Sequence, residues 1–383
     1  MSRPDPAALQ PDAAALRAIG WPSDEAGRPL DPAWQALLDA HPGSRPARVV
    51  EQHRTGYIVA DAPGAAFGVE SLGDWLRPPG YRAGRTDPEA RPGVGDWLLI
   101  EGPENAAKAL ALLPRHSAIK RGAAGEHYKQ QLIAANIDVV FVVSGLDGDF
   151  NPRRIERYLL LVHGSGAQAV IVLTKADVAG AATVGQARAA LSQVTIEGVE
   201  SVVVNARDAA SVDTLARWLG PGRTAVLVGS SGAGKSTLTN TLLGIERMKT
   251  GAVRGHDSRG RHTTTHRALI PLPQGGCLID TPGMRELKPT GEEDVTDTFA
   301  DVEALAAECR FRDCAHEKEP GCAVRAAVET GALDGQRLAN FRKLAGEVAA
   351  AGDRLATRLA QKAQARVPGK APGRRPDDKN GRR

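Results

Sequence analysis

Residues 229–237 have the composition and spacing of a loop that binds phosphate groups. They read GSSGAGKST, which fits the pattern GxxxxGK[ST], and they follow the apolar run RTAVLV and open a helical stretch. Glycines let successive backbone N–H groups face one anion, and a helix N-terminus adds a favourable dipole. Because strand, loop and helix occur together, a glycine-rich turn without a ligand is the weaker interpretation. The predicted nucleotide ligands here are Gly229, Ser230, Ser231, Gly232, Ala233, Gly234, Lys235, Ser236 and Thr237.

A second motif predicts which base the nucleotide carries. Thr174, Lys175, Ala176 and Asp177 end the apolar run AVIVLTK. Guanine offers two adjacent N–H donors that one carboxylate can accept, whereas adenine would leave a buried acceptor unpaired, so discrimination of about 10⁴ is within reach. A TKxD tetrapeptide alone is weak evidence, but it gains weight beside a phosphate loop. Asn205 and Ala206, after the next apolar run, are expected to contact the base from the other side.

A magnesium ion bound with the nucleotide would have ligands in three segments. The Ser236 hydroxyl can coordinate it, and Asp280 of the tetrapeptide DTPG can hold it through water. Thr264, in the run GRHTTTHR, is expected to close on the ion when the γ-phosphate is present, which would make that run a switch. A plain polar loop is the alternative. The Gly283 N–H and the Lys235 ammonium are expected to contact the γ-phosphate.

The group that would orient the attacking water is not the usual glutamine. Met284 occupies the position where many GTPases carry Gln, and a thioether cannot orient water. We therefore expect slow intrinsic hydrolysis, with His262 as the candidate catalytic residue. A solvated loop histidine is the open alternative.

The order of the motifs is rotated relative to ordinary GTPases. The base motif precedes the phosphate loop by about fifty residues, although it comes last in the usual order. A doubly wound sheet tolerates this permutation because its site is built from separate loops at the strand ends. The segment after Asp280 then leads directly into the C-terminal part, which suggests that nucleotide state is transmitted to it.

Three cysteines and one histidine lie within residues 309–322. Cys309, Cys314, His316 and Cys322 form the Cys₃His set of a closed structural zinc site, although iron and chance clustering are alternatives. The remaining Cys277 is expected to be a small buried residue.

The bulk composition narrows the class of protein. The chain has 383 residues and a net charge of +4, with eight Lys or Arg against two Asp in residues 362–383. It contains no run of 18 apolar residues and no secretory signal pattern, so no membrane span is expected. The clustered cysteines favour metal binding in a reducing compartment, and hence a cytoplasmic protein. Nothing demands more than a monomer.

The element pattern predicts a multidomain α/β protein. Residues 1–44 are expected to be a partly ordered N-terminal extension with a short helix around 32–40, and short strands over 45–118 suggest a small β-barrel. Alternating strands and helices over 119–287 predict a mainly parallel sheet, the permuted P-loop GTPase domain. Residues 288–365 are expected to be helical and to bind zinc, and 366–383 to be a disordered basic tail.

Over roughly residues 45 to 345 the chain resembles the bacterial ribosome small-subunit-dependent GTPase A family. Besides the motifs above, the resemblance rests on GVGDWLLIEG, QLIAANIDVVFVVSGLDGDFNPRRIERYLLL, GRHTTTHR and CRFRDCAHEKEPGCAVRAAVETG. It implies an oligonucleotide-binding (OB-fold) barrel, a circularly permuted GTPase and a zinc domain that grips ribosomal RNA. It also implies a hydrophobic residue at Met284 and a catalytic histidine at His262.

The resemblance implies a GTP hydrolase that acts late in maturation of the small (30S) ribosomal subunit. The expected ligands are GTP or GDP with Mg²⁺ and one structural Zn²⁺, the expected partner is the subunit with its 16S ribosomal RNA, and the subunit is expected to stimulate hydrolysis. No function is carried onto the N-terminal extension or the basic tail, whose charge suits phosphate contacts or simple solubility.

Three rival interpretations stay open. The first is an ATPase or kinase, which Asp177 disfavours. The second is an RNA-binding placeholder in which the nucleotide only tunes affinity. The third is a permuted GTPase of the large subunit, which the barrel and the cysteine cluster together make the weaker choice.

Overall fold

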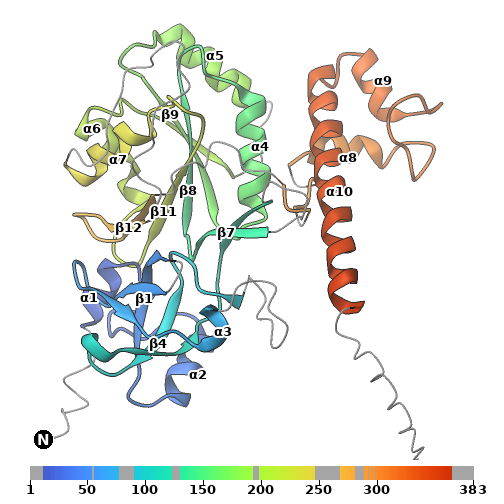
Figure 1. Cartoon of the computed structure of the whole chain (residues 1–383). Coiled ribbons are helices and arrows are strands. Elements are labelled where there is room, and N and C mark those ends of the chain that lie inside the picture. Colours follow the sequence, from blue (N-terminus) through green and yellow to red (C-terminus); the bar gives the residue numbers. More distant parts are fainter. Residues whose placement is uncertain are drawn as a thin grey trace, which may run out of the picture.

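The structure is a computed structural model of the chain, and it describes most of the residues. The described ranges are 12–53, 56–76, 90–122, 130–192, 198–245, 268–280, 289–291, 293–296 and 298–364. Figure 1 shows three parts: strands β1–β5 with the N-terminal helices, a central sheet with helices on both faces, and a C-terminal group of helices beside α4. Within the described ranges, no helix is both long enough and apolar enough to span a bilayer.

The central sheet has six strands in the order β10-β9-β8-β11-β13-β12. Neighbouring strands are parallel except for β12, which runs antiparallel to β13. This is the mainly parallel sheet that the alternating pattern predicted. The strands are β8 (Val139–Gly145), β9 (Gln168–Thr174), β10 (Glu200–Val203), β11 (Thr224–Val228), β12 (Ala268–Pro271) and β13 (Cys277–Asp280).

The continuous apolar runs of this sheet are explained by burial on both faces. In β8, Val139, Phe141 and Val143 pack on one face with residues of α6 (Ala209–Val212), η4 (Asp213–Trp218) and α7 (Lys235–Leu243) or their flanks. Val140 and Val142 pack on the other face with α4 (Pro152–His163) and α5 (Ala181–Leu191). A strand with a period of two residues and two covered faces must be apolar throughout.

The strands before this sheet form a separate antiparallel sheet in the order β3-β2-β1-β4-β5. It curls until its edge strands meet, because Glu70 N–H donates to Ala107 O at 2.8 Å and Ala109 N–H donates to Glu70 O at 2.9 Å. Its strands are β1 (Arg45–Gln52), β2 (Tyr57–Ala60), β3 (Ala66–Val69), β4 (Trp97–Glu101) and β5 (Lys108–Leu112), with α3 (Gly73–Leu76) and η3 (Glu104–Ala106). The hairpin β6 (Ala118–Gly122) and β7 (Gln130–Ala135) leads on to β8.

The segment before β1 contributes to the core. This segment contains helices α1 (Ala13–Ala18) and α2 (Pro32–Ala40), and α2 has the bounds expected for a short helix there. It also contains two fully buried tryptophans, Trp21 after α1 and Trp34 within α2. The ring centroids of Trp21 lie 4.9 Å from Trp34 and 4.7 Å from Trp97 of β4. Indole Nε1 of Trp34 donates to Pro114 O at 2.8 Å. Residues 12–44 therefore pack as part of the folded body.

Arg48 joins the N-terminal segment, the curled sheet and the central sheet. Its side chain is fully buried, and its guanidinium donates to Ile19 O at 2.6 Å, to Gly95 O at 3.2 Å and to Asn136 O at 3.0 Å. It also donates to Thr224 Oγ1, at the start of β11, at 2.7 Å. Five N–H donors in a fixed planar fork suit arginine to this junction.

The C-terminal helices enclose their own small core. They are α8 (Ala300–Ala306), α9 (Ala323–Glu329) and α10 (Gly335–Gln364). Phe299 and Phe341 meet edge to face at 5.3 Å, and Leu160 of α4 packs into the same cluster. The cluster therefore binds these helices to the central sheet through α4.

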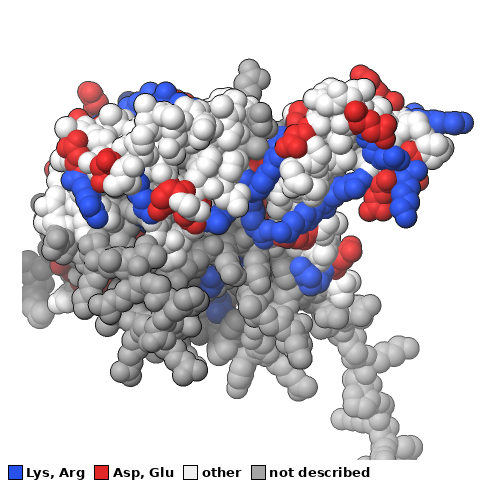
Figure 2. Space-filling model, turned by 90° about the horizontal axis from the view of Figure 1, so that it is seen from above, with Lys and Arg blue, Asp and Glu red and all other residues white. Residues whose placement is uncertain are grey.

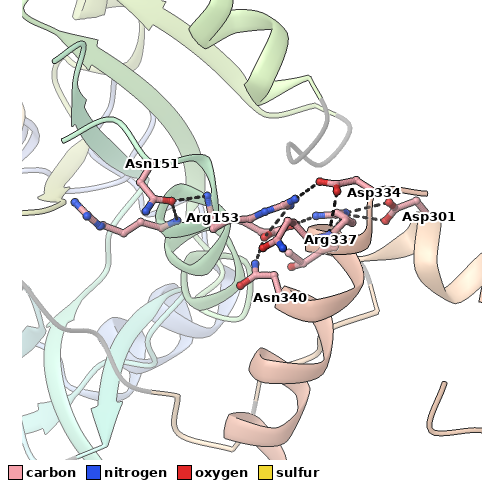
Figure 3. A network of polar contacts seen from close by, with 10 residues as sticks. Asn151, Arg153, Asp301, Asp334, Arg337 and Asn340 are labelled. Atoms are coloured by element: carbon pink, nitrogen blue, oxygen red, sulfur yellow. Dashed lines mark hydrogen bonds and ion pairs between the residues drawn. The ribbon is translucent and has the colours of Figure 1, made fainter. Parts of the chain in front are cut away.

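Polar contacts seal the same junction (Figure 3). Glu156 of α4 is fully buried, and its carboxylate contacts the guanidinium of Arg337 and accepts a hydrogen bond from the amide of Asn340. Arg337 also forms a bidentate pair with Asp301, at 2.7 and 3.0 Å. Arg153 pairs with Asp334 at 2.6 Å. A buried carboxylate is tolerated there because it is both paired and hydrogen-bonded.

Candidate functional site

The predicted nucleotide motifs gather at one edge of the central sheet. The phosphate loop follows β11, the base motif begins at the last residue of β9, and Asn205 follows β10. Asp280 is the last residue of β13 and is partly exposed. Since these strands are parallel, their carboxyl ends meet at the edge where ligands bind in such folds.

The phosphate loop needs glycine at its entry. Gly229 has a φ of +145°, and a Cβ there would lie 2.2 Å from the carbonyl oxygen of Val143 on β8. Gly234, with a φ of +94°, is the N-cap of α7, so Lys235, Ser236 and Thr237 form the first turn of that helix. The Lys235 ammonium donates to Gly229 O at 2.7 Å. The sequence-predicted lysine therefore lies over its own loop, where the phosphates of a nucleotide would sit.

Thr174 connects the base motif to the phosphate loop. Its side chain is fully buried, and its hydroxyl donates to Ala233 O at 2.6 Å. Ala176 N–H donates to Val204 O at 3.3 Å, which joins the base motif to the end of β10. Asp177 is exposed at this edge, so its carboxylate is accessible to a ligand.

The segment after β10 is fixed against the helix of the phosphate loop. The Asn205 side-chain oxygen accepts from Arg207 N–H at 3.0 Å, and Asn205 N–H donates to Ser211 Oγ at 2.9 Å. Ala206 O accepts from the hydroxyl of Thr241 on α7 at 2.6 Å. Residues 205 and 206 are thereby held against α7, and their predicted contact with the base stays a prediction.

Two aspartates to which the sequence assigned no role contact the nucleotide motifs, one the base motif and the other the phosphate loop. Asp147 and Asp149 lie in the loop between β8 and α4. Asp147 pairs with the Lys175 ammonium, and Asp149 accepts a hydrogen bond from the Ser230 hydroxyl. Asp149 also pairs with Arg154 at 2.5 Å. Their position in the sequence could have indicated this role, because GLDGDFN directly follows an apolar strand that ends at the same edge of the sheet.

The ion pair with Lys175 is reflected in the titration of Asp147. Desolvation would raise the pKa of this carboxyl, but the hydrogen bond from Lys175 and the N–H of Asp149 lower it below its ordinary value. Asp147 is therefore a carboxylate at neutral pH and holds the Lys175 side chain at the site.

Some predicted site residues lie outside the described part of the chain. They are Gly283, Thr264 and His262, together with Met284. Their predicted roles stay predictions.

The four predicted metal ligands converge at one point. The ligand atoms of Cys309, Cys314, His316 and Cys322 lie within 4.8 Å of one another. The Sγ atoms of Cys309 and Cys322 are 3.9 Å apart, and the Nδ1 atom of His316 lies 3.6 and 3.5 Å from them. A tetrahedral zinc ion, from its usual bond lengths, would place two sulfurs about 3.8 Å apart and a sulfur and a nitrogen about 3.6 Å apart. The donor set therefore fits such an ion in chemistry, and the three distances among Cys309, His316 and Cys322 fit its geometry.

Known proteins share both the sequence and the fold. A sequence model of the RsgA GTPase family matches residues 112–290. A protein of Xanthomonas campestris, named small ribosomal subunit biogenesis GTPase RsgA, is 63% identical over 352 residues, which cover 92% of this chain and 93% of that protein. The chain belongs to the RsgA GTPase family. The resemblance seen in its motifs is thus confirmed, and membership identifies it as a GTPase.

Further matches agree with membership of the RsgA family. The Xanthomonas oryzae protein of the same name is 63% identical over 354 residues, which cover 92% of this chain and 94% of that protein. The crystal structure of YjeQ from Thermotoga maritima matches with a TM-score of 0.56 at 22% identity, over 80% of this chain and 98% of that one. YloQ, described as a circularly permuted GTPase, matches with a TM-score of 0.54 at 22% identity, over 81% and 96%. These likenesses establish the circularly permuted GTPase fold.

Proposed function

We propose that this chain hydrolyses GTP as a late maturation factor of the small ribosomal subunit. The observation that carries the proposal is the meeting of a guanine motif and a phosphate loop, joined by Thr174 and Ala233, in a member of the RsgA family. The name of its curated relatives, small ribosomal subunit biogenesis GTPase, supports the choice of partner. A role on ribosomal subunits also supports a location in the cytoplasm.

The described residues can bind and orient the nucleotide. Asp177 would accept the two N–H donors of guanine, while Asn205 and Ala206 would approach the base from the next strand. Backbone N–H groups of residues 229–237 and the Lys235 ammonium would hold the phosphates. A magnesium ion, held by Ser236 and through water by Asp280, would neutralise charge on the leaving phosphates.

The residues that would complete the site around the γ-phosphate and the attacking water lie in other segments of the chain. We assign Thr264 to the magnesium ion, Gly283 to the γ-phosphate and His262 to the water, because Met284 has no hydrogen-bonding group strong enough for that role. Basal turnover should therefore be slow unless the partner supplies or positions the missing group.

The other two parts of the chain would contact ribosomal RNA. The curled sheet, within residues 45–118, is assigned as an OB-fold barrel, and its closure by Glu70 and Ala107 supports this. Residues 288–365 are assigned as a domain held by one Zn²⁺ on Cys309, Cys314, His316 and Cys322, which would supply fold stability and not catalysis. On the face seen in Figure 2, acidic and basic side chains are interspersed, so RNA contacts there would be local.

The test is GTP turnover by the purified protein alone, with small subunits and with large subunits. Slow basal turnover that only small subunits stimulate strongly is the expected result. Stimulation by large subunits alone, or by neither, would overturn the proposed partner. Asp177→Asn should lose guanine selectivity by about 100-fold or more, because one amide cannot accept both N–H donors. Asp213→Asn, at an exposed aspartate of η4, is the matched control.

A further inference from the structure

The loop of residues 314–322, which carries three of the four metal ligands, is folded around one carboxylate. Between Cys314 and Cys322, Glu319 accepts three backbone hydrogen bonds from residues before it in the chain. Its Oε1 accepts from Ala315 N–H at 3.2 Å, and its Oε2 accepts from Glu317 N–H at 2.8 Å and from Lys318 N–H at 3.0 Å.

These hydrogen bonds enclose a backbone conformation that is unfavourable by itself. His316 has a φ of +60°, in the left-handed region, which is unfavourable for a residue with a Cβ. The residues on either side of it, Ala315 and Glu317, both donate to Glu319. A strained residue persists where its surroundings over-determine it.

The strained conformation is the one that brings His316 to the other ligands. The imidazole is buried, and its Nδ1 atom lies 3.5 Å from Cys322 Sγ and 3.6 Å from Cys309 Sγ. If the loop relaxed, the imidazole would leave this position, and the ion would lose one of its four donors.

We propose that Glu319 is a positioning residue that holds the loop of residues 314–322 in its metal-binding conformation. This inference rests on the proposed zinc site, and Glu319 itself is not among the four ligands. The electrostatics agree, because backbone N–H groups, its own and those of Lys318, Glu317 and Ala315, outweigh desolvation and lower the pKa of Glu319 to about 2. The carboxylate is therefore charged, and charge-assisted bonds to N–H groups are the stronger kind.

The chain offers a matched control in the same loop. Glu317 is also acidic, and it is exposed, whereas Glu319 is half-buried. The three backbone hydrogen bonds end on the carboxylate of Glu319 and not on that of Glu317. Glu319→Gln and Glu317→Gln therefore remove the same charge at neighbouring positions, and only the first disturbs the acceptor.

The experiment measures zinc affinity of the full-length protein by competition with a chromophoric chelator. Glu319→Gln should bind zinc about 10- to 100-fold more weakly, the range found when groups that orient metal ligands are changed, while Glu317→Gln should match the unmodified protein. Amide hydrogen exchange of metal-free protein should show faster exchange at residues 315, 317 and 318 in Glu319→Gln alone. Glu319→Asp, whose carboxylate is one methylene shorter, should show an intermediate loss.

Three results would overturn the role of Glu319. The first is a zinc affinity of Glu319→Gln within threefold of the unmodified protein. The second is an equal loss in Glu317→Gln, which would mean that charge alone matters. The third is failure of the unmodified protein to bind zinc, which would also remove the metal assignment itself. In the first two results the unmodified protein still binds zinc. They would therefore reject the role of Glu319 without rejecting the proposed zinc site.

Discussion

The hydroxyl of Thr174 donates a hydrogen bond of 2.6 Å to the backbone carbonyl of Ala233, and both groups are buried. Thr174 ends β9 and begins the base motif, whereas Ala233 lies in the phosphate loop, 59 residues later in the chain. The two halves of the nucleotide site are thus joined by a hydrogen bond of the protein itself. Preorganisation of this kind lowers the free-energy cost of ordering the site on binding.

Thr174→Val should test this link, since valine keeps the shape but cannot donate. The carbonyl of Ala233 would be left buried without its partner, so we expect a loss of about 1–3 kcal/mol in the free energy of unfolding. GDP affinity should fall with it. Chemical denaturation and titration with a fluorescent GDP analogue measure the two effects. Thr214→Val, at an exposed threonine, is the control and should change neither; equal effects in both variants would contradict the role of the link.

The junction between α4 and α10 should depend on keeping Glu156 paired. Arg337→Met removes the closer of two cationic partners of a fully buried carboxylate, the other being Arg153 at 3.8 Å, and breaking such a pair on one side costs about 3–5 kcal/mol. The double variant Glu156→Gln with Arg337→Met should recover much of that loss, because no charge is then left buried alone. Denaturant unfolding of the C-terminal part, followed by hydrogen exchange in α10, provides the measurement.

The control for that junction is an exposed pair of the same chemistry. Arg325 pairs with Glu329 on the surface of α9, and Arg325→Met should cost less than about 1 kcal/mol. A similar loss in both arginine variants would show that the buried pair has no special role.

Stability should fall in alkali because of Cys277. Burial raises the pKa of this thiol from 9.0 to about 11, although the neighbouring Arg48 acts in the opposite direction. Because the folded-state pKa is the higher one, the contribution is fully present below pH 9 and is lost as the pH rises to about 11. The difference corresponds to roughly 3 kcal/mol of unfolding free energy.

Cys277→Ala isolates this contribution. The variant should be less stable at pH 8, because it leaves a small cavity, but its stability should fall less steeply between pH 9 and 11. Arg48, and Asp96 and Asp138 near it, are common to both proteins, so their effects cancel in the comparison. Unfolding free energies, measured by urea denaturation, that fall equally steeply with pH in both proteins would refute the role of Cys277.

The segment before β1 should be required for stability. Trp34 is fully buried against Trp21 and near Trp97, so Trp34→Ala should cost about 3–5 kcal/mol. Leu30→Ala, at an exposed side chain of the same segment, should cost less than about 0.5 kcal/mol. Thermal unfolding of both variants measures the two losses of stability. Similar losses in the two variants would mean that the segment is dispensable.

The sequence by itself determined the features whose residues are adjacent or nearly so. The phosphate loop occupies nine consecutive residues, and the four metal ligands fall within fourteen, so spacing alone carries their geometry. The parallel sheet was predictable for a similar reason, since strands covered on both faces are apolar throughout. The rotated motif order was visible too, because it concerns sequence position and not contact.

Only the tertiary structure decided which distant residues meet. Asp147 and Asp149 belong to no motif read from the sequence, and their contacts with Lys175 and Ser230 exist because β8 lies between β9 and β11. Arg48 and Thr224 are 176 residues apart, and Asn340 and Glu156 are 184 apart. Such pairs have no local signature, because either partner alone is an ordinary polar residue on its own element. They become a buried network only when packing excludes water, so that the polar groups have only one another as hydrogen-bond partners.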